Sequence, residues 1–63
     1  MSTLNLQPNI EDPDGFYAEL LAAHDGLSDD ESAAFNARLV LILANVVGSR
    51  AVLTQAIHAA ART

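Results

Sequence analysis

The sequence predicts an all-α fold: a three-helix domain that assembles with a second chain into a dimeric helical bundle. Hydrophobic residues make up 51% of the chain and aromatic residues only 5%, a composition suited to helix–helix contacts. Residues 39–47 are apolar apart from Asn45, and a helix that is apolar all round needs cover on every side. The flanking segments are too short to supply all of that cover, so another chain is expected to contribute.

The first 11 residues show neither helical nor strand periodicity and are expected to form an irregular arm before a domain at 12–63. Asp12 is placed to cap a helix, and Pro13 suits the first helical position because that position needs no N–H donor. This helix is expected over 13–25, ending before Gly26.

The S-x-x-E motif that begins at Ser28 predicts the start of a second helix, because the serine oxygen and the glutamate carboxylate satisfy each other's backbone donors. This helix is expected over 29–47, with Gly48 as a left-handed stop. Ser49 can cap a third helix over 50–61, which has one apolar stripe and one polar face.

The second helix has two apolar faces at helical spacing. The bulky face consists of Phe35, Leu39, Ile42, Leu43 and Val46. The small face consists of Ala33, Ala37, Val40, Ala44 and Val47. We expect the bulky face to pack on the first and third helices of the same chain, and the small face to admit a helix of another chain. The predicted interface residues are Ala37, Val40, Leu41, Ala44 and Val47.

Four residues form a possible polar site: Tyr17, His24, Arg38 and Asn45. His24 falls on the apolar stripe of the first helix, where it can serve as a core histidine, as a partner of the last helix carbonyls, or as a general acid or base. Arg38 can reach Glu31 or Asp30, an acidic residue across the interface, or an anion. Asn45 can fix the register of an assembly or contact a ligand.

The charges divide along the chain, with all eight acids in the first 31 residues and all three arginines after them. A net charge of −5 without a basic patch argues against nucleic acid as a partner. The chain has no cysteine, two histidines and no catalytic or phosphate-binding motif. We therefore expect no metal, no cofactor and no enzymatic activity. The apolar run is too short to cross a membrane and no signal peptide is recognisable, so a cytoplasmic location is expected.

Two stretches resemble a family of short bacterial proteins catalogued as domain of unknown function 2783. They are Asp12-Pro13-Asp14-Gly15-Phe16-Tyr17 through Leu20-Leu21, and Glu31 to Asn45 followed by Gly48. Within the second stretch, Asn36-Ala37-Arg38-Leu39 and Leu43-Ala44-Asn45 carry the pattern. In the family a histidine often follows the asparagine and an aspartate often follows the glycine, whereas Val46 and Ser49 stand there in this chain.

The resemblance implies no activity. The genes of this family look like neighbours of genes for flavin-dependent aromatic hydroxylases and hydrolases, which suggests an accessory subunit. The leading hypothesis is a non-catalytic interaction module or small subunit that forms a homodimer, or binds a larger enzyme subunit, through the second helix. The alternative is a ligand-binding or catalytic accessory of a flavin-dependent aromatic hydroxylase system, built around the possible polar site. A third option is an acidic inhibitor of a basic protein.

Overall fold

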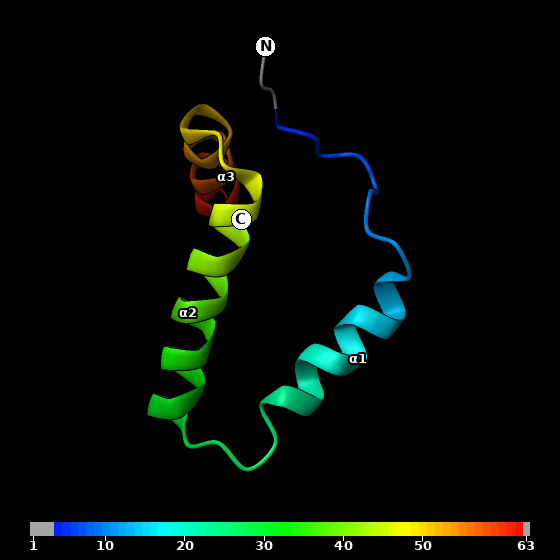
Figure 1. Cartoon of the computed structure of the whole chain (residues 1–63), viewed down its shortest axis with the longest axis vertical. Helices are drawn as coiled ribbons and strands as arrows, with labels where there is room; N and C mark the ends of the chain where they lie inside the picture. The colour runs from blue at the N-terminus through cyan, green and yellow to red at the C-terminus, as the bar shows by residue number, and fades with distance from the viewer. Residues whose placement is uncertain (1–3, 63) are drawn as a thin grey trace.

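The computed structural model describes residues 4–62, and within this range the chain forms three α-helices and no strand (Figure 1). Helix α1 spans Pro13–Ala23, α2 spans Asp29–Val47 and α3 spans Arg50–Ala61. The predicted all-α class is confirmed. Residues 1–3 of the predicted arm and residue 63 lie outside the described residues.

Helix α1 begins at the cap that the sequence predicts. Asp12 has a left-handed backbone, with φ of 50°, and its carboxylate accepts a hydrogen bond from the N–H of Gly15 at 3.2 Å. Pro13 occupies the first helical position. Glycine suits position 15, because a Cβ there would collide with the Asp12 carboxylate. Neighbouring residues alone therefore fix the start of this helix.

Helix α1 ends at Ala23, earlier than the end predicted at residue 25. The N–H groups of His24 and Asp25 each donate at 3.1 Å to the carbonyl three residues before them. Hydrogen bonds of this spacing wind the chain more tightly than an α-helix does. Gly26, with φ of 80°, then turns the backbone toward α2.

The caps of α2 and α3 are those that the sequence predicts. The Ser28 hydroxyl accepts from the N–H of Glu31 at 3.2 Å, and the Glu31 carboxylate accepts from the N–H of Ser28 at 2.8 Å. At the other end of α2, Gly48 has φ of 77° and donates its N–H to the carbonyl four residues earlier at 2.9 Å. The Ser49 hydroxyl accepts from the N–H of Val52 at 3.2 Å and so caps α3.

The described part of the arm is tied to α3 at one point. The N–H of Leu4 donates to Oε1 of Gln55 at 3.1 Å, joining residues far apart in the sequence. Leu4 is half-buried, whereas Leu6 and Ile10 are exposed. The arm therefore runs beside α3 before it descends to α1 (Figure 1).

The helices do not close around a common core. Helices α1 and α2 diverge from the loop that joins them (Figure 1), and no Cα atom of α1 lies within 8 Å of one in α2. Packed helices place their axes about 8–10 Å apart, so these two are not packed along their lengths. The radius of gyration is 13.4 Å, against about 11 Å for a compact domain of this length.

The predicted packing of the bulky face of α2 within one chain is wrong for most of its length. Phe35 and Leu39 are half-buried, but Ile42, Leu43 and Val46 are exposed. These three side chains are exposed because α1 has diverged from the second half of α2, and because the chain turns away from the α2 axis at Gly48 (Figure 1). Within residues 4–62 no side chain is buried.

Candidate interaction surface

His24 joins the end of α1 to the beginning of α2. Its Nδ1 lies 3.0 Å from the hydroxyl oxygen of Ser32, a hydrogen bond whose donor depends on the histidine tautomer. Its ring also meets the ring of Phe35 edge to face, with centroids 4.8 Å apart and planes at 71°. His24 and Ser32 are both half-buried. This arrangement engages the imidazole in a structural contact between the two helices.

The other members of the possible polar site are not gathered around His24. Tyr17 is 60% exposed, and Arg38 and Asn45 are exposed on α2. At 1.5 Å per residue, Asn45 stands about 20 Å along the helix from Ser32, the partner of His24. The four side chains therefore do not line one pocket in the described chain, and no observation favours the ligand-binding alternative built on them.

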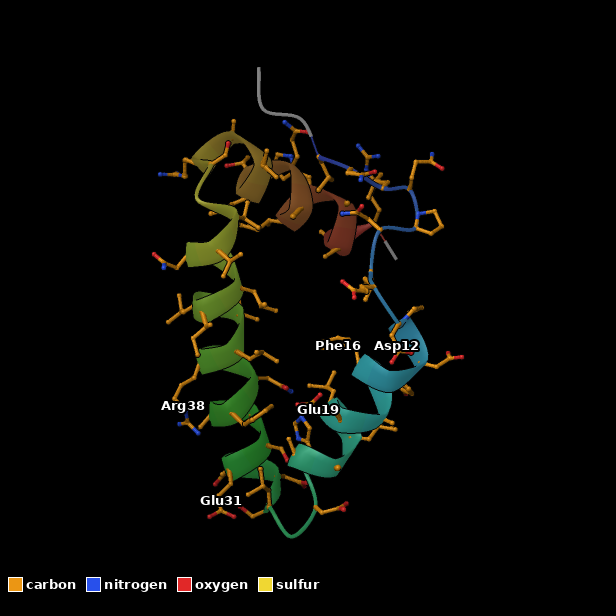
Figure 2. The ribbon with its side chains drawn as sticks, turned by 45° about the vertical axis from the view of Figure 1, so that its right-hand side comes forward. Asp12, Phe16, Glu19, Glu31 and Arg38 are labelled. Atoms are coloured by element: carbon orange, nitrogen blue, oxygen red, sulfur yellow. The ribbon has the colours of Figure 1, made fainter. Side chains whose placement is uncertain are left out.

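Of the alternatives for Arg38, the contact with Glu31 or Asp30 of its own helix is not made in the described chain. Within the described part of the chain, Arg38 makes no ion pair or hydrogen bond through its side chain. Figure 2 shows it leaving α2 on the side turned away from α1. The expected pairing with an acidic residue of another chain stays a prediction.

A shallow apolar groove lies between α1 and α2, near the loop that connects them. Its lining residues are Phe16, Glu19, Leu20, Ala23, Phe35 and Leu39. Glu19 is the charged residue of this lining, and Figure 2 shows it on the side of α1 that faces α2. The sequence did not single out Glu19, because helical periodicity does not show which residues of one helix face another helix.

The second half of α2 presents a series of large apolar side chains to solvent. The exposed fractions are 70% for Leu41, 61% for Ile42 and 77% for Val46. Of the predicted interface residues, Ala37, Val40, Leu41 and Val47 are exposed, whereas Ala44 is half-buried. Such residues lie on all sides of the helix, so no single neighbouring element of the chain could cover them.

Metal-binding clusters and membrane-spanning helices are both absent from the described residues. Among the described residues, no cluster of three or more His, Cys, Asp and Glu side chains is placed to hold a metal ion. In the same part of the chain, no helix combines the length and the apolar character needed to span a bilayer.

The family described as "Protein of unknown function (DUF2783)" matches residues 4–62, nearly the whole chain. The chain belongs to this family. No curated protein and no solved structure matches it. The DUF2783 match confirms the resemblance seen in the sequence, and the family description carries no activity.

Proposed function

We propose that this DUF2783 chain is a non-catalytic protein-interaction module, or the small accessory subunit of a larger complex, and that it self-associates through α2. The proposed interface includes Ala37, Val40, Leu41, Ala44 and Val47. Exposed apolar surface that is continuous along one helix is typical of sites for other proteins. Catalysis plays no part in this proposal.

One observation carries the proposal: the isolated chain exposes far too much surface for a folded protein of its size. Its accessible surface is 5513 Å², whereas a compact protein of 6.6 kDa exposes about 3,900 Å². The difference is about 1,600 Å² per chain, and part of it belongs to the extended arm. A domain this small, with no cysteine in its sequence and no metal-binding cluster among residues 4–62, needs another source of stability. Association with another chain supplies it.

Two differently tagged copies of the chain, produced in one cell, test self-association directly. Because the copies pair at random, capture of the first tag should recover the second copy at about half the amount of the first. A variant pair carrying Leu41→Glu in both copies should lose this recovery, because Leu41 belongs to the proposed interface. If the second copy is not recovered with the unaltered chain, the chain does not self-associate and the proposal is wrong.

A further inference from the structure

The groove between the diverging helices α1 and α2 is suited to bind a further helix. Phe16 and Leu20 of α1 and Phe35 and Leu39 of α2 turn apolar atoms into the groove between the helices. Farther from the loop, Leu43 and Val46 continue the bulky face of α2 and are exposed. A third element placed between two diverging helices can cover the apolar inner sides of both.

We infer that this third element is α2 of a second copy of the chain, inserted antiparallel between α1 and α2. The inference rests on the proposed self-association and specifies its geometry. Exchange of the same element between two identical chains gives a closed, two-fold symmetric dimer. Each α2 then contacts its counterpart through the bulky face, and the partner's α1 covers the opposite side, where Ala37 and Leu41 lie.

The surface area agrees with a second copy as the occupant. Covering the excess on each of two chains would bury at most about 3,200 Å² in total, less the share of the extended arm, and permanent dimers bury about 2,000–5,000 Å². The same symmetric arrangement covers both apolar faces of α2 at once. A single foreign helix in the groove would leave the face with Leu41, which is 70% exposed, still in water.

The charges next to the groove also complement each other between copies. Glu19 lies in the lining of the groove, and within the described residues neither Glu19 nor Arg38 has an ionic partner. Arg38 projects from the side of α2 that the partner's α1 would cover (Figure 2). In the inferred dimer, Glu19 of one copy therefore lies beside Arg38 of the other, twice per dimer.

A charge exchange tests this pairing. Glu19→Arg and Arg38→Glu, each alone, replace two attractive pairs with two repulsive ones, so the dimer dissociation constant should rise about tenfold. The double variant Glu19→Arg/Arg38→Glu restores opposite charges and should return close to the original value. Glu11→Arg combined with Arg38→Glu is the matched control, because Glu11 lies outside the groove. This combination should not restore association.

Disulfide formation between introduced cysteines provides a second readout. No native cysteine can compete, because the chain has none. A Glu19→Cys chain mixed with an Arg38→Cys chain should form the mixed disulfide faster than a Glu11→Cys chain mixed with the same partner. A self-associating chain with neither charge rescue nor preferential disulfide formation would refute the inserted helix while leaving the proposed function standing. A chain that stays monomeric would refute both.

Discussion

Replacing Leu41 with glutamate should dissociate the assembly while removing few contacts within the single chain. Leu41 is 70% exposed in the single chain, so the substitution removes little packing there. Full burial of a leucine side chain contributes about 1.5–3 kcal/mol. Burial of the exposed part in a dimer therefore contributes about 1–2 kcal/mol per chain, or about 2–4 kcal/mol for the two chains.

This loss corresponds to a rise in the dimer dissociation constant of about 30-fold to 1,000-fold. The value is a lower bound, because Leu41→Glu also places an unpaired carboxylate in the contact. The matched control is Ile57→Glu on α3, where the original side chain is 67% exposed and lies outside the proposed interface. Sedimentation velocity across a concentration series measures both constants, with circular dichroism as the test of helix content. Equal effects of the two substitutions would refute the proposed role of α2.

Three smaller changes test the local structure, each by the thermal unfolding midpoint at one fixed protein concentration. Ser28→Ala removes the capping box of α2 and should cost about 1 kcal/mol; an unchanged midpoint would contradict the cap. Gly48→Ala places a side chain at φ of 77° and should cost about 1 kcal/mol, whereas a higher midpoint would argue against the left-handed stop. His24→Ala removes the contacts with Ser32 and Phe35 and should lower the midpoint; a rise would show that they strain the fold.

The helix boundaries were predictable from the sequence where caps determine them. Ser28 and Ser49 act on backbone groups within three residues, so their effect can be recognised without knowledge of the rest of the fold. The end of α1 was not predictable in this way. His24 leaves the helix in a tighter turn and binds Ser32 of the next helix, a contact that depends on tertiary structure.

Helical periodicity in the sequence could not predict how the helices pack against each other. The spacing of Phe35, Leu39 and Leu43 shows that they share a face of α2, but not whether α1 stays close enough to cover all three. The loop between α1 and α2 sets that angle, and Leu43 is exposed because the helices have diverged by that point. For the same reason, Tyr17, His24 and Asn45 could be nominated as a polar site from the sequence but not brought together in space.

The mass of the unaltered chain in solution tests the central claim most directly, since that claim is that α2 is covered by a second copy. Sedimentation equilibrium over a wide concentration range should give a species of twice the 6.6 kDa chain mass. The helix content should fall as dilution separates the copies, because the single chain leaves α2 uncovered. A fully helical species of 6.6 kDa at every concentration would contradict the account.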